Sequence, residues 1–302
     1  MKTVELLNST PERLDIALAK SLGISRAKAQ RAIKDGRVFV DGEVATAHHL
    51  VDTSKAVTIE PLSVEAQAKT GQLPVVDIIY EDDDVLVVNK PSGVLVHPTE
   101  ASNEYTLIDA IIAQRPQIAD VGDNKARSGI VHRLDKEASG VLIVAKNNNA
   151  FNHLKQAFAE RLTSKHYTVL VTGKVPDEVG TINFPIARSS SRARMAARPL
   201  SQEGKEAITH YEVTKRFANA TLVDVRIETG RTHQIRAHFF ALGSPVAGDT
   251  LYVQRGLKQF PIGRLFLHAR ELTIPLPSGE TKTFVAPPPQ DLENFLTTLH
   301  EV

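Results

Sequence analysis

The apolar runs of this chain are short. Two of the strongest, Val85–Val88 and Val141–Ala145, have the length of strands, whereas a helix that spans a bilayer needs about 20 apolar residues. Predicted strands outnumber predicted helices and do not alternate strictly with them. We therefore predict an α+β fold with a largely antiparallel sheet. The first residues also lack the apolar core of a signal peptide, so we expect a cytoplasmic protein without a membrane partner.

The composition excludes several kinds of chemistry. The 302 residues include no cysteine, which rules out disulfides, thiolate metal sites and cysteine nucleophiles. Hydrophobic residues make up 42% of the chain, as expected of a protein that buries a core. The formal net charge is only +1, so a nucleic-acid-binding surface would have to be a local basic patch.

Residues 11–60 have the pattern of a separate small module. A short helix is followed by a second one at Arg26–Lys34, for which Ser25 is a potential N-cap. A strand at Val38–Val40 then reaches Asp41-Gly42, a pair of residues typical of a tight hairpin turn. We predict a small α/β module from these elements.

The second predicted helix is basic. Between Arg26 and Arg37 the chain carries five cations and one acid, Asp35. Solvated faces usually mix both signs, so the imbalance favours a phosphate-binding face over a merely solvated one. The order of helix, basic helix and hairpin resembles the RNA-binding domain named after ribosomal protein S4, which implies RNA binding. The residues expected to contact RNA are Arg26, Lys28, Arg31, Lys34 and Arg37.

Residues 61–74 have the composition of a linker, with few large apolar residues and a proline at each end. We expect residues 75–302 to form the larger domain. Apolar residues at helical spacing predict an amphipathic helix at Asn149–Leu162, and further helices are predicted at His233–Leu242 and Asp291–Leu299.

The densest cluster of chemically useful groups lies at Gly129–Ala145. A polar turn, His132–Asp135, comes just before an apolar strand, and a carboxylate at the end of a rigid strand is well placed for catalysis. Arg133 and Asp135 would point the same way in an extended segment and diverge in a turn. The alternative is a salt bridge within the turn.

A second cluster, Thr229–His238, is rich in basic and imidazole groups. His233 and His238 are five residues apart, unlike the four-residue spacing of helical zinc ligands, and no acid lies between them. We therefore predict no metal site. An arginine from this segment would form a charge-assisted pair with Asp135 if the fold brought the two together.

Five motifs occur in a fixed order along residues 75–298. They are N-K-P-S-G at 89–93, H-R-L-D-x-x-x-S-G at 132–140, K-x-Y at 165–167, G-R-T-H-Q-I-R-x-H at 230–238 followed by G-x-P-x-x-G-D-x-x-Y at 243–252, and L-H-A at 267–269. This series resembles the RluA-type family of large-subunit ribosomal RNA pseudouridine synthases and implies that family's catalytic domain. The segments Phe184–Arg188, Arg194–Ala196 and Gly204–Ala207 look most like the D-type subgroup of the family.

The resemblance implies a role for each matching residue. Asp135 would be the catalytic carboxylate, with Arg236 paired to it and Tyr167 against the target uracil. Arg133 would fill the space left by the extruded nucleotide, and Leu267 would form an apolar floor under the base. Further substrate contacts are expected from His132, Arg231 and His233.

One position departs from the family pattern. Ala138 stands where the family usually has threonine before Ser-Gly, so the contacts of that hydroxyl must be made differently here.

The segment Arg188–Arg198 carries four arginines and no acid. It is either a surface loop or a clamp on the RNA backbone, and the resemblance favours the clamp. Its arginines are Arg188, Arg192, Arg194 and Arg198.

The sequence thus predicts an isomerase that converts uridine to pseudouridine in RNA, and the resemblance favours large-subunit ribosomal RNA as the substrate. Pseudouridine contains the same atoms as uridine, so we expect no cofactor, redox step or metal. Two alternatives remain open: a pseudouridine synthase that acts on transfer RNA, and a non-catalytic RNA-binding factor for ribosome assembly. A hydrolase that uses paired carboxylates is disfavoured, because the acidic run Glu81–Asp84 resembles a solvated turn.

Overall fold

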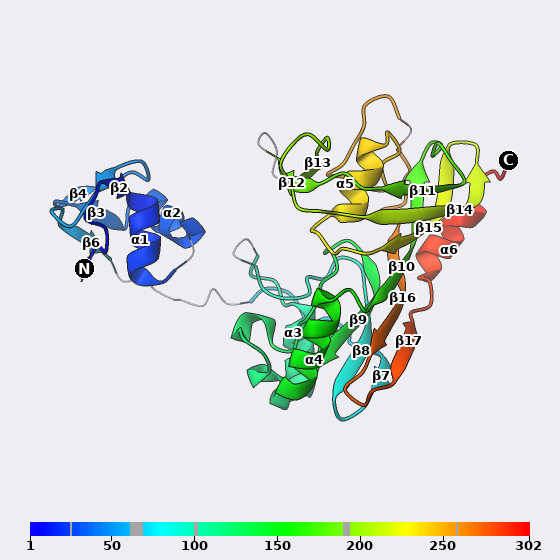
Figure 1. The fold of residues 1–302 in the computed structure, drawn as a ribbon, viewed down its shortest axis with the longest axis horizontal. Coiled ribbons are helices and arrows are strands. Elements are labelled where there is room, and N and C mark those ends of the chain that lie inside the picture. Colours follow the sequence, from blue (N-terminus) through cyan, green and yellow to red (C-terminus); the bar gives the residue numbers. More distant parts are fainter. Residues whose placement is uncertain (25, 61–68, 100–101, 190–193, 258) are drawn as a thin grey trace. The chain divides into compact units, whose positions relative to one another are not determined.

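The chain folds into two compact units, Met1–Ala68 and Lys69–Val302 (Figure 1). The computed structural model describes residues 1–24, 26–60, 69–99, 102–189, 194–257 and 259–302. Each unit has a hydrophobic core of its own. Among the described residues, no helix has both the length and the apolar character needed to cross a membrane.

The N-terminal unit combines two helices with short strands. Its elements are β1 (Lys2–Val4), β2 (Glu12–Arg13), α1 (Leu14–Leu22), α2 (Arg26–Lys34), β3 (Val38–Val40), β4 (Glu43–Val44), β5 (Leu50–Val51) and β6 (Val57–Ile59). The antiparallel sheet has the order β1-β6-β3-β4, and β2 pairs with β5. Because β1 pairs with β6, this unit includes residues before position 11. The basic helix and the hairpin have the predicted bounds, while Ser25, the expected N-cap, lies outside the described residues.

The larger unit contains one long sheet flanked by helices. Its elements are β7 (Asp77–Glu81), β8 (Val85–Lys90), α3 (Leu107–Gln114), β9 (Ser139–Ala145), α4 (Asn148–Ala159), β10 (Ser164–Thr172), β11 (Val179–Ile182), β12 (Ile186–Arg188), β13 (Met195–Ala197), β14 (Thr209–Phe217), β15 (Ala220–Ile227), α5 (Gln234–Ala241), β16 (Leu267–Pro275), β17 (Thr281–Val285) and α6 (Gln290–Thr297).

The nine-stranded sheet has the order β11-β14-β15-β10-β16-β9-β8-β7, with β17 paired to β16. Only β9 and β16 run parallel among its pairings in the described chain, and the others are antiparallel. The predicted α+β fold with a largely antiparallel sheet is thereby confirmed. Strands β10 and β16 lie in the middle of this order, between a part that carries α3 and α4 and a part that carries α5 (Figure 1).

The apolar runs noted in the sequence are strands covered on both faces. Along β8 and β9, Leu86 and Leu142 belong to the core that includes α3, whereas Val87 and Ile143 belong to the core that includes α4. Successive side chains of a strand point to opposite faces, so a strand between two helical layers is apolar at every position.

The predicted helix Asn149–Leu162 is shorter than expected at its C-terminal end, where α4 stops at Ala159. Arg161 adopts a positive φ of 61°, and the amide groups of Arg161 and Leu162 donate to the carbonyls of Phe158 and Ala157. This is the Schellman arrangement, which ends a helix. Leu162 is consequently 57% exposed and does not extend the buried face of α4.

Gly140 allows β9 to approach β16 closely. Its φ is +119°, and a Cβ atom at this position would lie 2.1 Å from the carbonyl oxygen of Ala269. Because the obstacle is backbone of the paired strand, it cannot move aside without disturbing the only described parallel pairing of the sheet.

We expect Gly140→Ala to destabilise the protein far more than Gly279→Ala. Gly279 also has a positive φ, +88°, but a Cβ there would meet no atom within 4 Å, so that variant carries only backbone strain of about 1–3 kcal/mol. Denaturant unfolding of both variants measures the difference. Equal losses would show that β9 and β16 tolerate a wider separation.

Candidate active site

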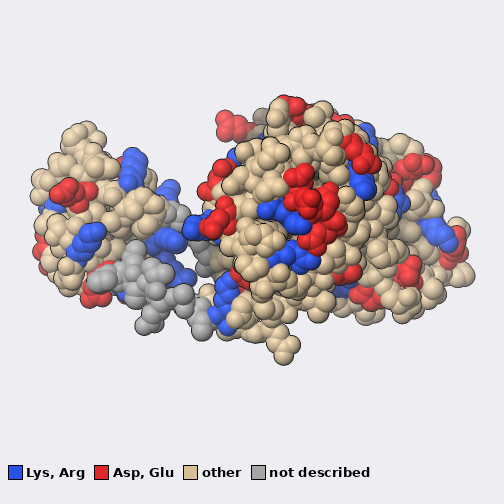
Figure 2. Space-filling model, turned by 90° about the horizontal axis from the view of Figure 1, so that it is seen from below, with Lys and Arg blue, Asp and Glu red and all other residues tan. Residues whose placement is uncertain are grey.

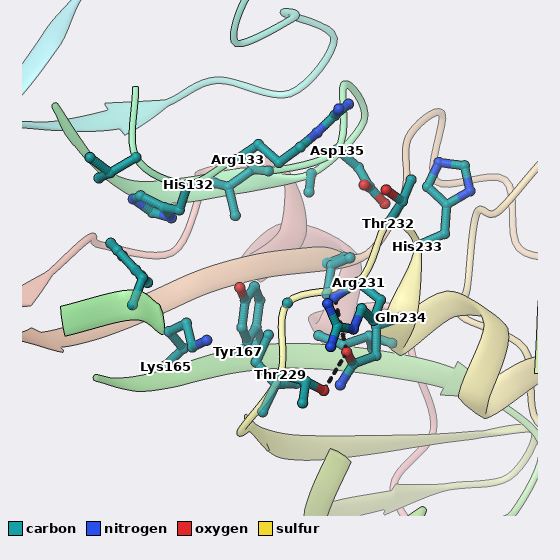
Figure 3. Close-up of a pocket in the computed structure, with 18 of the residues that line it drawn as sticks. His132, Arg133, Asp135, Lys165, Tyr167, Thr229, Arg231, Thr232, His233 and Gln234 are labelled. Carbon is teal, nitrogen blue, oxygen red and sulfur yellow. Dashed lines mark hydrogen bonds between the residues drawn. The ribbon is translucent and has the colours of Figure 1, made fainter. Parts of the chain in front are cut away.

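A cavity of about 480 Å³ lies over β10 and β16, in the middle of the sheet order. Its walls come from three segments far apart in the sequence: residues 130–135 before β9, residues 227–236 between β15 and α5, and the start of β10 (Figure 3). The fold thus brings residues of the second, third and fourth motifs around one space.

Arg133 and Asp135 diverge, as expected for a turn. The carboxylate of Asp135 points towards the Thr232–His233 segment, whereas the side chain of Arg133 extends away from Tyr167 (Figure 3). Arg133 is exposed, and the side chain of Asp135 is only 13% exposed. The two residues therefore face different surroundings and do not form the local salt bridge that was the alternative.

Arg236 reaches Asp135 from α5. Its Nη1 donates to Oδ2 of Asp135 at 3.2 Å and also lies 3.4 Å from Oε2 of Glu137. The structure thus makes the pairing that the motifs implied, between residues 101 positions apart. A guanidinium beside a nearly buried carboxylate gives a charge-assisted hydrogen bond, which fixes the orientation of the carboxylate.

Asp249 fixes Arg236 from the opposite side. It accepts two parallel hydrogen bonds, from Nε at 2.7 Å and from Nη2 at 2.9 Å, and its side chain is fully buried. Burial opposes the charges on both residues, but their mutual hydrogen bonds outweigh it, lowering the pKa of Asp249 and raising that of Arg236. Sequence reasoning gave Asp249 no role, although it is the acid of the G-D-x-x-Y motif.

Tyr167 and Leu267 lie side by side in the floor of the cavity, on β10 and β16. The hydroxyl of Tyr167 points towards the His132–Asp135 segment (Figure 3) and has no hydrogen-bond partner among the described residues. Burial raises the pKa of Tyr167, and the charge of Asp135 adds to the effect. The phenol is therefore neutral at physiological pH and available to a bound molecule.

His132, a predicted substrate contact, lines the cavity and also makes contacts within the protein. Its Nε2 accepts the amide hydrogen bond of Ile143 at 3.0 Å, and its ring stacks on Phe158. Burial lowers its pKa to about 3, with Lys165 contributing, so the ring is neutral. The ring lines the cavity, but Nε2 already accepts the hydrogen bond from Ile143.

The segment after β15 is held by Gln234 rather than by its basic residues. Gln234 accepts hydrogen bonds from the hydroxyl of Thr229 and the amide of Arg231, which shapes the turn that borders the cavity. Arg231 donates from Nε to the carbonyl of Glu206, and His233 lies 3.2 Å from the hydroxyl of Tyr252. The residues of this segment that line the cavity include Thr229, Arg231, His233 and Gln234.

The N-K-P-S-G turn braces the loop that carries Asp135. Lys90 is fully buried, and its Nζ donates to the carbonyls of Pro91, Val94 and Lys136 at 2.8, 2.7 and 3.1 Å. Burial lowers the pKa of Lys90 to about 7, although Asp135 and Glu137 act in the opposite direction. This residue, which sequence analysis placed only in a turn, holds the backbone next to the carboxylate.

The L-H-A motif contributes one residue to the cavity and one to the core. Leu267 faces the cavity, whereas His268 is fully buried and bonds Ser139 at 3.0 Å and the carbonyl of Ala286 at 3.2 Å. His238, from the fourth motif, is likewise fully buried, between Thr209 and the carbonyl of Phe184.

The arginine-rich segment makes internal contacts on the described part of its length. Arg194 lies over the ring of Phe240 and donates to the carbonyl of Leu251. Arg198 donates to Gln202 and to the carbonyl of Arg188. Arg192 lies outside the described residues. The face in Figure 2 shows basic and acidic side chains interspersed on the larger unit.

The basic face of the N-terminal unit is present on α2. Arg26, Lys28, Arg31 and Lys34 are exposed and Arg37 is half-buried. Arg26 is partly engaged, because its Nε donates at 2.9 Å to Asp15, a fully buried acid that also accepts hydrogen bonds from Arg13 and Gln30. Fewer than five cations are therefore available to a phosphate backbone without rearrangement.

The model of the RNA pseudouridylate synthase family matches residues 84–241, and that of the S4 domain matches residues 12–57. The chain belongs to the RNA pseudouridylate synthase family, whose members are isomerases, and it carries an N-terminal S4 domain. The assignment made from the motifs is thereby confirmed.

Relatives match over nearly their full length. An uncharacterised RNA pseudouridine synthase of Bacillus subtilis is 37% identical, with 96% of this chain and 95% of that protein covered. Ribosomal large subunit pseudouridine synthase D of Xanthomonas campestris is 36% identical, with 96% of this chain and 89% of that protein covered. Among solved structures, human RNA pseudouridylate synthase domain containing 1 is similar with a TM-score of 0.63 and 28% identity, covering 78% of this chain and 91% of its own.

We expect Asp249→Asn to lower stability by about 3–5 kcal/mol, because it leaves Arg236 buried with one of its charge partners removed. Glu137→Gln is the control: it removes another acid near the same guanidinium, but one whose side chain is 48% exposed, and its expected cost is below about 1 kcal/mol. Denaturant unfolding measures both variants. Similar small losses would mean that Asp249 does not anchor Arg236.

Proposed function

We propose that this chain isomerises uridine to pseudouridine in large-subunit ribosomal RNA, with Asp135 as the catalytic carboxylate. The observation that carries the proposal is the position of that carboxylate, nearly buried in the cavity and 3.2 Å from Arg236. The relatives named for the large ribosomal subunit support the choice of RNA.

The reaction conserves every atom of the substrate. The bond between C1′ and N1 of the uracil breaks, a bond between C1′ and C5 forms, N1 takes up a proton and C5 loses one. A carboxylate can act on the sugar either as a nucleophile or as a base. Both roles require a carboxylate held in a fixed position, and Asp135 accepts a hydrogen bond from Arg236. The second interaction of Arg236, with Asp249, keeps its guanidinium in place throughout.

The target nucleotide must leave its stack before it can reach Asp135, at a cost of a few kcal/mol. Tyr167 and Leu267 offer a neutral aromatic and an apolar surface on which the extruded base packs. Arg133 is exposed and extends away from that floor, which suits a side chain that fills the vacated space in the RNA.

We expect Asp135→Asn to abolish conversion and Glu137→Gln to retain most of it. Both acids lie within 3.4 Å of Nη1 of Arg236, but only Asp135 lines the cavity. Pseudouridines are mapped across all RNA in cells that lack the gene and carry the wild type or either variant. Sites that reappear in large-subunit RNA with the wild type and with Glu137→Gln, but not with Asp135→Asn, support the proposal.

Three results would contradict parts of it. Turnover by Asp135→Asn would remove Asp135 from the chemistry. Sites confined to transfer RNA would replace the proposed substrate and leave the mechanism in place. Full RNA binding without any conversion by the wild type would favour the assembly-factor alternative.

Removing Met1–Ala68 should weaken RNA binding but not prevent conversion. The remaining unit keeps its own core and the whole cavity. Each lost phosphate contact makes the log–log salt dependence shallower by about 0.7–0.9, so the loss of four contacts from α2 would change the slope by about 3. Salt titrations of RNA affinity for the full and shortened chains measure this change. An unchanged slope would mean that α2 is not an RNA-binding face.

A further inference from the structure

His97 is a buried histidine with no hydrogen-bond partner among the residues that the structure describes. It lies between β8 and α3, lines the cavity and is only 4% exposed. Its Nδ1 is closed off from solvent and unpaired, and Nε2 makes no hydrogen bond within the described chain. A buried polar group without a partner destabilises a protein. Because the ring lies in the wall of the cavity, a ligand bound there can supply the missing hydrogen-bond partner.

The imidazole of His97 is uncharged. Burial lowers its pKa to about 4, with the positive charges of Arg127 and Arg133 contributing. The ring can thus offer a neutral N–H group to a ligand at physiological pH. Arg127 and Arg133 line the same cavity as the ring.

Arg127 and Arg133 are exposed, line the same cavity, and have no carboxylate within salt-bridge distance among the described residues. The other arginines that line the cavity are engaged. Arg161 pairs with Glu206, Arg231 donates to the carbonyl of Glu206, and Arg236 pairs with Asp135 and Asp249. The side of the cavity formed by His97, Arg127 and Arg133 therefore carries positive charge that no described carboxylate compensates.

We infer that His97 and Arg127 form a binding site for one phosphodiester group of the RNA strand, next to the nucleotide that enters the cavity. This inference rests on the proposed function, because a nucleotide drawn into the cavity brings its two flanking phosphates to the rim. A guanidinium group and a neutral N–H are suitable donors for phosphate oxygens. The bound phosphate accepts from Nε2 of His97, the ring nitrogen that is not closed off from solvent.

Opposite effects of one substitution on stability and on affinity test the site. We expect His97→Leu to raise Tm by about 2–4 °C, because an unpaired buried polar group is removed. The same variant should bind RNA about tenfold more weakly. His97→Gln keeps an N–H donor near the position of Nε2 and should restore most of the affinity. A purely structural His97 would instead give a lower Tm for both variants and unchanged affinity in the folded fraction.

A scan of the RNA backbone identifies the ligand. The probe is the shortest RNA that the wild type converts, whichever cellular RNA it comes from, so a wrong choice of large-subunit RNA leaves this test intact. Single phosphates around the target are replaced by uncharged methylphosphonates, and binding is compared between wild type and Arg127→Gln. At the contacted phosphate, the replacement should lower the RNA affinity of the wild type about tenfold. It should lower the affinity of Arg127→Gln, which has already lost the contact, hardly at all.

Two results would overturn the inference. If the losses of affinity from Arg127→Gln and from the methylphosphonate were additive at every phosphate, Arg127 would not contact one defined group. A loss of affinity in His97→Leu that is matched by 2′-deoxy substitution, and not by any methylphosphonate, would assign His97 to a ribose hydroxyl. Lys125→Gln is the matched control, since Lys125 is an exposed cation two residues from Arg127 that pairs with Asp120 and does not line the cavity.

Discussion

The guanidinium of Arg236 is the interaction on which the larger unit's site depends. It lies on α5 and bonds Asp249, which follows that helix, and Asp135, which precedes β9 on the other side of the central strands. A charge buried to this degree is tolerated only when its donors are satisfied. Two carboxylates satisfy it, so the position of one acid fixes that of the other. The same bonds that stabilise the buried charge set the direction of the carboxylate in the cavity.

The rest of the site is built around that pair by backbone contacts. Lys90 uses its whole donor set on three carbonyls, one of them belonging to Lys136, next to Asp135. Gly140 lets β9 reach β16, the strand that carries Leu267. The loop that carries Asp135 is thereby held by Lys90 and by the pairing of β9 with β16, and the carboxylate itself is held by Arg236. Such support is what keeps a reactive group within the narrow range of geometry that catalysis requires.

The cavity is lined by both neutral and charged groups. His97, His132 and Tyr167 all carry pKa shifts that favour the uncharged form, with burial as the main cause. The charged groups include Asp135 with Arg236, and the exposed Arg127 and Arg133. This division suits a substrate whose base is neutral and whose backbone is anionic. The interior of the cavity meets the base, and the rim meets the phosphates.

The sequence determined the local structure and the family. The basic helix and the Asp-Gly hairpin have their predicted bounds because caps, turn residues and helical spacing are local signals. The end of α4 was missed, since its Schellman turn uses Arg161 in a conformation that glycine usually adopts. The motifs pointed to Asp135 and Arg236 through a resemblance, while only the fold brings them within 3.2 Å across 101 residues. Tertiary structure alone decided that Asp249 anchors Arg236, that Lys90 braces the loop of Asp135 and that Nε2 of His132 accepts a backbone hydrogen bond. These facts depend on burial and on long-range hydrogen bonds, which leave no periodicity in a single sequence.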